Sequence, residues 1–229
     1  MDRGDVAELA GSVGLGAWTA LAVLTMVVVG GDGTPLFLDS GLLSWSLAHR
    51  PDAAVALARG VTATGTGVVP YALVVPAGLA VGRTARQRVT ATLLGLGCLL
   101  AGQLTRAVLM NLVARPRPPH ADWRTHASGW AFPSGHTTTS ALTAGLLVVA
   151  LCVRAPRGRG ALCAVAGCWA VLVGLTRIYL GVHWFTDVIG GWLFAAGWLG
   201  LCLAAAARWL PPRLVHDATG TPREPDDAP

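Results

Sequence analysis

The sequence predicts an all-α, polytopic membrane protein, a bundle of six transmembrane helices, and two observations lead to this fold class. Of the 229 residues, 53% are hydrophobic and only 13% are charged, with a mean hydropathy of +0.56, whereas soluble domains carry about 25% charged residues. The apolar residues also gather in stretches of the length that crosses a bilayer as a helix, about 20 residues. We therefore expect residues 1–210 to form one membrane domain.

The candidate spans follow one another along the chain. They cover residues 11–30, 65–81, 89–107, 138–153, 161–180 and 188–210. The second is short and contains Pro70 and Pro76, which makes it the weakest of the six. The segment between the first two spans is amphipathic in places and is expected to form helices lying on the membrane surface. The proline-rich tail, 211–229, is expected to be disordered.

The arginines of the short loops predict the orientation. Eight lie on one side of the predicted bundle (Arg83, Arg86, Arg88, Arg154, Arg157, Arg159, Arg208 and Arg213), and five lie on the other (Arg50, Arg59, Arg115, Arg117 and Arg124). Cytoplasmic loops carry the excess of positive charge. Both termini should therefore be cytoplasmic, in the plasma membrane, and no nucleic-acid partner is expected because the net charge of +5 is spread over these loops.

Three polar clusters fall on the opposite, outer face. They are "ARPRPPH" at residues 114–120, "PSGH" at 133–136 and "TRIYLGVHWFTD" at 176–187. Each has a structural interpretation, with Arg115 and Arg117 as membrane anchors, Ser134 and Asp187 as helix caps and His183 as an interfacial residue. A charge such as Arg177 within a span nevertheless costs at least about 2.5 kcal/mol and usually marks a function. All three clusters on one face indicate a site at the outer ends of the helices.

The residue types in these clusters suit phosphate chemistry. Arginine forks match phosphate oxygens, and the amides at the start of a helix after Ser134 and Gly135 attract an anion. Asp187 follows His183 by four residues, so its carboxylate can fix the imidazole tautomer and leave the other nitrogen free as a nucleophile. His136 can protonate a departing oxygen. This combination predicts phosphoryl transfer through a phosphohistidine.

The three clusters resemble the signature motifs of the type 2 phosphatidic acid phosphatase (PAP2) superfamily, over residues 110–187. The resemblance implies a metal-independent phosphatase without a cofactor. His183 would be the nucleophile, Asp187 would orient it, and His136 would protonate the leaving group. The phosphate would be held by Arg117, Arg177, Ser134 and the amide of Gly135. In the third motif, Thr176 stands where serine is usual.

The first motif departs from the family pattern. Met110 stands where a lysine normally precedes the final arginine of that motif by seven residues. Arg106 lies four residues earlier, on the same helical face about 6 Å deeper, and its long side chain can reach toward the surface. We expect Arg106 to replace the lysine charge; the structural alternative is a pair with Gln103.

The expected substrate is a lipid phosphate or a polyprenyl diphosphate, because the site lies at the membrane surface. Four aromatic residues are expected at the interface around it: Trp123, Trp130, Phe132 and Trp184. Two other functions stay open: a phosphotransferase that passes the group to a lipid or sugar acceptor, and a non-enzymatic anion or lipid transporter. A zinc site of His120, His126, His136 and His183 is disfavoured by the neighbouring arginines. The sequence leaves open which lipid is bound and what oligomer forms.

Overall fold

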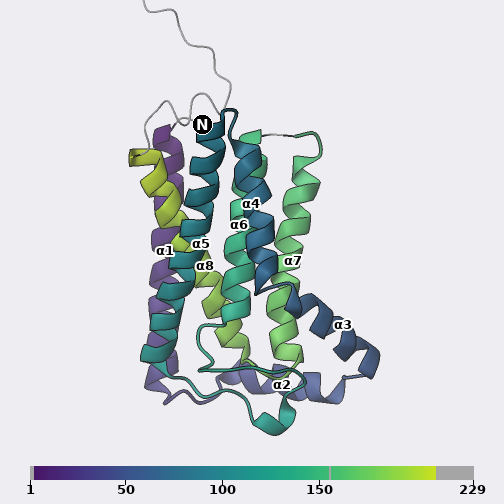
Figure 1. The fold of residues 1–229 in the computed structure, drawn as a ribbon. Coiled ribbons are helices and arrows are strands. Elements are labelled where there is room, and N and C mark those ends of the chain that lie inside the picture. The colour runs from purple at the N-terminus through teal and green to yellow at the C-terminus, as the bar shows by residue number, and fades with distance from the viewer. Residues whose placement is uncertain (1–2, 155, 210–229) are drawn as a thin grey trace, which may run out of the picture.

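The computed structural model describes residues 3–154 and 156–209, and every regular element in these ranges is helical (Figure 1), as predicted. The tail 211–229 lies outside the described residues. The helices are α1 (Arg3–Gly30), α2 (Phe37–Ala48), α3 (Asp52–Ala63), α4 (Val68–Val81), α5 (Ala85–Val113), α6 (Gly135–Arg154), α7 (Arg159–Tyr179) and α8 (Phe185–Trp209), with a short 3₁₀ turn, η1 (His120–Asp122).

Five helices, α1 and α5 to α8, are long and apolar enough to span a membrane. The second predicted span is helical only over Val68–Val81, and 14 residues rise about 21 Å, less than the bilayer core. This helix is the second half of a bent pair with α3, and the axes meet at 49°. Gly67 permits the bend, since its φ of +68° lies in a region that other residues rarely adopt. The structure has six candidate spans only if α3 and α4 together are counted as one span.

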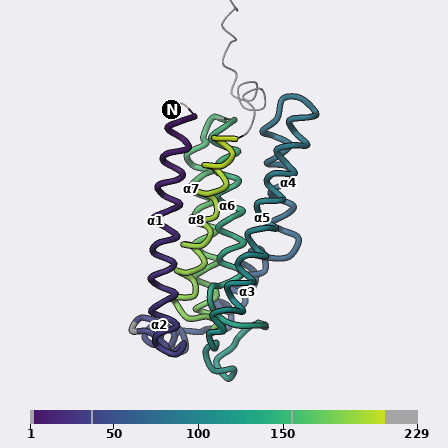
Figure 2. The backbone as a smooth tube through the Cα atoms, turned by 90° about the vertical axis from the view of Figure 1, so that its left-hand side faces the viewer, coloured from purple at the N-terminus to yellow at the C-terminus, as the bar shows by residue number. Residues whose placement is uncertain are grey.

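Small residues let α1 and α8 approach each other closely. α1 runs along α8 (Figure 2), and a Cβ on Gly200 would lie 2.5 Å from the Cα of Gly14. Such contacts are typical of helices that associate in lipid. Below this contact the rings of Trp18 and Phe194 meet edge to face at 5.3 Å. The bundle is therefore held by close backbone contact along its length and by aromatic packing.

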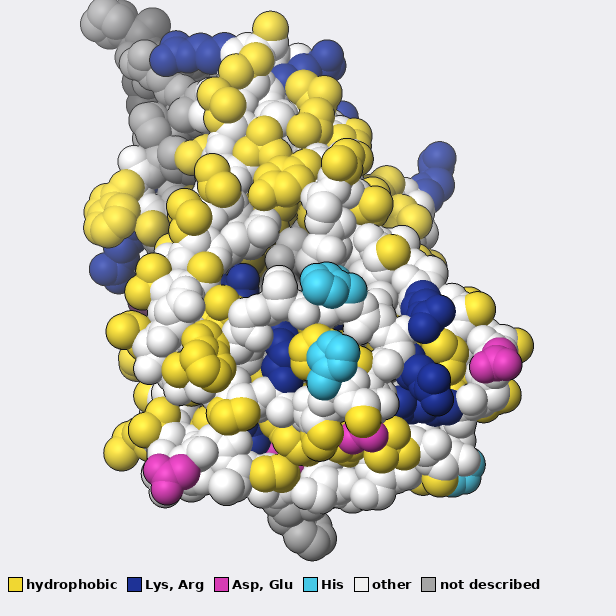
Figure 3. Space-filling view, turned by 60° about the horizontal axis from the view of Figure 1, so that its bottom comes forward, with side chains coloured by type: hydrophobic (Ala, Val, Ile, Leu, Met, Phe, Trp, Pro, Cys, Tyr) yellow, Lys and Arg dark blue, Asp and Glu magenta, His cyan; other side chains and the backbone are white. Residues whose placement is uncertain are grey.

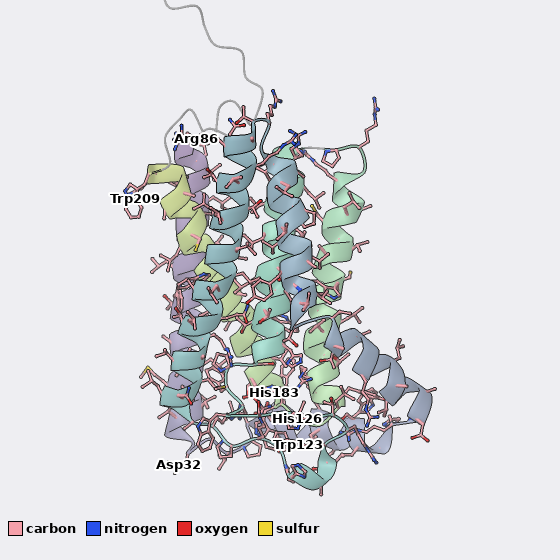
Figure 4. All side chains as sticks on the ribbon, in the orientation of Figure 1. Asp32, Arg86, Trp123, His126, His183 and Trp209 are labelled. Carbon is pink, nitrogen blue, oxygen red and sulfur yellow. The ribbon has the colours of Figure 1, made fainter. Side chains whose placement is uncertain are left out.

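The two ends of the bundle differ in what they carry. Arg86 and Trp209 lie at one end, and His183, Trp123 and Asp32 lie at the other (Figure 4). α1 begins where α8 finishes, and Arg3 donates to the carbonyl of Ala207 across 2.9 Å. α2 crosses the far end of the bundle, and α3 extends outward from it (Figure 1). The arginine-rich loops are thus separated from the predicted site by the length of the spans.

Candidate active site

The three polar clusters meet at the end of the bundle that α2 crosses. One cluster is in the loop after α5, the second begins α6, and the third joins α7 to α8. Viewed from this end, histidine side chains lie at the centre of the face with arginine side chains beside them (Figure 3). The predicted convergence at one end of the helices is therefore present.

His183 lies between a carboxylate and a guanidinium. Its Nδ1 is 3.3 Å from Asp187 Oδ2, and its Nε2 is 2.9 Å from Arg117 Nη1. Arginine has no acceptor atom, so Nε2 must accept this hydrogen bond and Nδ1 must carry the proton toward Asp187. Trp184 supports the arrangement, because its backbone N–H donates to the same Asp187 oxygen at 2.8 Å. The ring is fixed in the tautomer that carries its lone pair on Nε2, the atom that faces Arg117.

The surroundings of His183 favour its neutral form. Burial lowers the pKa of His183 well below its ordinary value, and the charges of Arg117 and Arg177 lower it further, as does His136. A neutral imidazole is the form that can act as a nucleophile. Burial, and after it the charges of the neighbouring arginines, therefore favour the neutral ring.

Arg117 is held in place by backbone carbonyls of two loops. Its guanidinium donates at 2.7–3.0 Å to the carbonyl oxygens of Ser128, Gly129, Trp130 and Val182. Burial lowers the pKa of Arg117, an effect that the charge of Asp187 opposes and the charge of Arg106 reinforces. The orientation of this cation is thus set by the protein before any anion arrives.

Arg177 and His136 reach the site from α7 and α6. Arg177 is buried, and its Nη1 donates to Thr62 Oγ1 at 3.0 Å. Its Nε is also buried and has no hydrogen-bond partner among the described residues. A buried donor without a partner costs about 1–3 kcal/mol, which an anion in the site would offset. His136 Nε2 lies 3.2 Å from Thr66 Oγ1.

The first turn of α6 lets other groups lie close to its backbone. Ser134 is buried, its N–H donates to the carbonyl of Asp187, and its hydroxyl accepts from Thr137 Oγ1 at 3.0 Å. A Cβ on Gly135 would lie 3.3 Å from Cζ of Arg106. The absence of a side chain at Gly135 therefore lets the guanidinium of Arg106 lie against the first turn of the helix. Helix N-termini offer free N–H groups to anions.

Arg106 does not pair with Gln103, the structural alternative raised by the sequence. Gln103 Nε2 instead donates to the hydroxyl of Tyr71 at 3.1 Å. Arg106 Nη1 extends one turn outward and lies 3.1 Å from the sulfur of Met110. Its guanidinium thus lies beside the side chain at the position where the family pattern has a lysine.

Sequence reasoning missed Asp39 and left Arg115 without a role. Arg115 is buried and bridges two carboxylates, with Nη2 2.8 Å from Asp39 Oδ2 and Nη1 2.7 Å from Asp187 Oδ1. It is therefore no membrane anchor. The carboxylate of Asp39 also accepts from the backbone N–H and the hydroxyl of Thr186. The available signal was a charge within the apolar run "LFLDSGLL" at residues 36–43.

Two of the four aromatic residues expected at the interface are core residues. Phe132 is completely buried and packs in a cluster with Leu21, Val28 and Phe194. Trp184 is also buried, and its indole N–H donates to the carbonyl of Pro116. Phe132 directly precedes one polar motif and Trp184 lies inside another, but both rings pack in apolar clusters, that of Trp184 with Leu43 and Ala131.

The fold and the site together define a polytopic helical membrane protein with arginine side chains gathered around a carboxylate-bound histidine. The family model of the PAP2 superfamily matches residues 91–210, more than half of the chain. The protein belongs to the PAP2 superfamily.

Two similar proteins are bacterial lipid phosphatases by name. Phosphatidylglycerophosphatase B of Bacillus subtilis (strain 168) is 38% identical over 92 residues, which cover 39% of this chain and 45% of that protein. Lipid A 1-phosphatase of Rhizobium etli is 36% identical over 115 residues, 46% of this chain and 44% of the relative. The matched segments thus span less than half of either relative.

A solved structure resembles the whole bundle. The crystal structure of a transmembrane PAP2-type phosphatidylglycerolphosphate phosphatase from Bacillus subtilis superimposes with a TM-score of 0.73. The match covers 87% of this chain and 98% of that one at 24% identity. At this identity the likeness concerns the fold, and it agrees with the helical plan described above.

Proposed function

We propose that the protein is a membrane lipid phosphatase that hydrolyses a lipid phosphate or diphosphate through a phosphohistidine. The observation that carries the proposal is the line Asp187–His183–Arg117, in which the unprotonated Nε2 of the imidazole faces a cation. A phosphoryl group bound by that cation lies next to the nucleophile. The names of the relatives above support the reaction class.

The first half of the reaction forms a bond from His183 Nε2 to phosphorus and breaks the bond from phosphorus to the lipid oxygen. His136 gives its proton to that oxygen, so that the lipid leaves as an alcohol. The phosphoryl oxygens are held by Arg117, Arg177, Arg106, the hydroxyl of Ser134 and the amide of Gly135. These donors stabilise the charge of the transition state without a metal ion.

In the second half, water attacks the phosphohistidine. The nitrogen–phosphorus bond breaks, inorganic phosphate leaves, and neutral His183 is regenerated while Asp187 keeps its ring in place. The protonated state of His136 is restored by the proton that the attacking water loses. With a lipid monophosphate, the cycle consumes one water and releases one alcohol and one phosphate. With a lipid diphosphate, the lipid monophosphate leaves in place of the alcohol.

Two features support a lipid substrate at the outer face. The site lies at one end of the spans, close to where lipid head groups would be, rather than at the bilayer midplane where transporter sites usually lie. The opposite end carries the arginine-rich loops, and the positive-inside rule assigns such loops to the cytoplasm. We therefore assign the site to the extracytoplasmic face of the plasma membrane and the termini to the cytoplasm.

Phosphate release by the purified protein in detergent tests the function. The substrates are phosphatidic acid, phosphatidylglycerol phosphate and farnesyl diphosphate, with His183→Gln as the inactive control. Release from at least one lipid by the wild type and from none by the variant supports the proposal. Transfer of the phosphoryl group to added glycerol in preference to water would assign the protein to the phosphotransferases instead.

A further inference from the structure

The break between α3 and α4 reaches the candidate site, although no signature motif includes it. The segment "TATGT" at residues 62–66 carries three threonines at alternate positions. Thr62 Oγ1 accepts from Arg177, Thr64 Oγ1 accepts from Trp169 Nε1 at 2.8 Å, and Thr66 Oγ1 bonds His136 Nε2 at 3.2 Å. Two of the three hydroxyls therefore hold residues proposed to act on phosphate.

The segment is fixed against α7, so its hydroxyls have defined positions. A Cβ on Gly65 would collide with Val173, which shows that the backbone lies directly on that helix. The next glycine, Gly67, allows the chain to turn immediately into α4. Thr66 is thus presented to His136 by a backbone that packs against α7 immediately before the bend.

We propose that Thr66 is a positioning residue for the general acid His136. The proposal rests on the proposed function and assigns to this segment a part in leaving-group protonation. The χ2 torsion of histidine has a broad energy well, so a hydrogen bond to a ring nitrogen decides where the ring points. Thr66 is the residue that forms such a bond with the His136 ring in the described part of the chain.

A hydroxyl suits this task because its oxygen can accept a hydrogen bond. Before proton transfer, the His136 imidazolium donates its Nε2–H to Thr66 Oγ1, and its Nδ1–H is the proton available to the leaving oxygen. After Nδ1 has given up its proton, the neutral ring still donates Nε2–H to Thr66. The ring keeps its partner in both states, whereas valine at position 66 has the same shape and cannot accept this bond.

The test compares two substrates that share a lipid tail and differ in leaving group. Dioctanoyl phosphatidic acid must expel an alcohol, which needs a proton, whereas dioctanoylglycerol diphosphate expels phosphatidic acid, a far weaker base. kcat/KM is measured because it reports the steps up to the phosphoenzyme. Thr66→Val should lower kcat/KM for the monophosphate about 10- to 100-fold, a part of the usual contribution of a general acid. The decrease in kcat/KM for the diphosphate should be several-fold smaller.

Two further variants separate this role from support of the fold. Thr66→Ser keeps the hydroxyl and should retain most of the wild-type kcat/KM on both substrates. Thr64→Val makes the same substitution two residues away, where the lost bond goes to Trp169. This variant should change kcat/KM for both substrates by the same factor. Thermal unfolding in detergent confirms that all the variants are folded.

The outcomes are distinct for the two proposals. Equal losses on the two substrates for Thr66→Val, or the same selectivity from Thr64→Val, overturn the role of Thr66 while the phosphatase function stands. Failure of Thr66→Ser to restore activity to a folded protein also overturns it. A wild-type protein that releases phosphate from neither lipid removes the proposed function and the role of Thr66 with it.

Discussion

Arg115 and Asp187 form an ion pair of 2.7 Å in which both side chains are completely buried. The second nitrogen of the guanidinium, Nη2, contacts Asp39 of α2 at 2.8 Å. One cation therefore connects the helix that crosses the end of the bundle to the carboxylate behind His183. Removing one member of such a group leaves an uncompensated buried charge, at a cost of about 3–5 kcal/mol.

The first prediction concerns this connection. Asp39→Asn keeps the size of the side chain and removes its charge, so it should lower the thermal stability and also kcat. Arg115→Lys should do the same, because one ammonium lacks the fork that spans both carboxylates. In a double-mutant cycle, Asp39→Asn and Arg115→Met together should lower the free energy of unfolding by less than the sum of the two single changes. Additive unfolding free energies would contradict the coupling.

The second prediction concerns the nucleophile. His183→Gln should abolish turnover and also the label that the wild type acquires from lipid carrying ³²P in its terminal phosphate. A phosphohistidine is lost in acid and survives in base, which distinguishes it from a phosphoester. His126→Gln, at an exposed loop histidine, is the matched control and should still be labelled. Turnover by His183→Gln would remove the assignment.

The third prediction is the titration of His183. The pKa is lowered, so the neutral form should persist as the pH falls through about 6.5, the usual value for histidine. It should be lost only when the pH falls through the lower folded-state pKa. ¹⁵N NMR of histidine-labelled protein in detergent measures this, with the signal assigned by its absence in His183→Gln. Protonation at or above the usual value would show that the surrounding arginines do not act on this ring.

The fourth prediction concerns metals. Within the described ranges, no three His, Cys, Asp or Glu side chains are grouped so that they could hold an ion. If Arg117, Arg177 and the start of α6 balance the charge of the phosphate as proposed, turnover should survive EDTA, and vanadate should inhibit by imitating five-coordinate phosphorus. Loss of activity on chelation, with recovery on adding Zn²⁺ or Mg²⁺, would require a metal-dependent mechanism.

The sequence was sufficient for the features that depend on local pattern. Apolar stretches located the five long helices, and the spacing of His183 and Asp187 indicated their contact, because four residues are one turn. The second span, expected over 65–81, is helical over Val68–Val81 and is one half of a bent pair, because hydropathy does not show where a helix bends. The glycines at 65 and 67 carried that information, but glycine is also frequent inside continuous transmembrane helices.

The parts of the site that the sequence did not predict depend on contacts between distant segments. Asp39 and Arg115 are 76 residues apart, and Thr66 and His136 are 70 apart. A lone aspartate or threonine in an apolar segment has no periodicity that would pair it with a particular partner. Only the packing of α2 and of the α3–α4 bend against the end of the bundle brings these side chains together.

Arg106 provides the last prediction, since its guanidinium lies against Gly135 and beside Met110. If it supplies the charge of the missing lysine, Arg106→Ala should lower kcat/KM at least tenfold, the scale of one lost charge-assisted bond of about 1.5–3 kcal/mol. Adding Met110→Lys to that variant should restore much of the loss, because it returns a cation one turn nearer the surface.

The control is Asn111→Ala on the same helix. Asn111 is exposed and bonds only its own helix, through the carbonyl of Ala107, so this variant should match the wild type. Both Arg106 variants should also insert and unfold like the wild type, since Arg106 contacts no carboxylate among the described residues. Full activity in Arg106→Ala would show that Arg117, Arg177 and the start of α6 suffice for the phosphate. Met110→Lys alone should then raise activity, because it would add a cation that the site lacks.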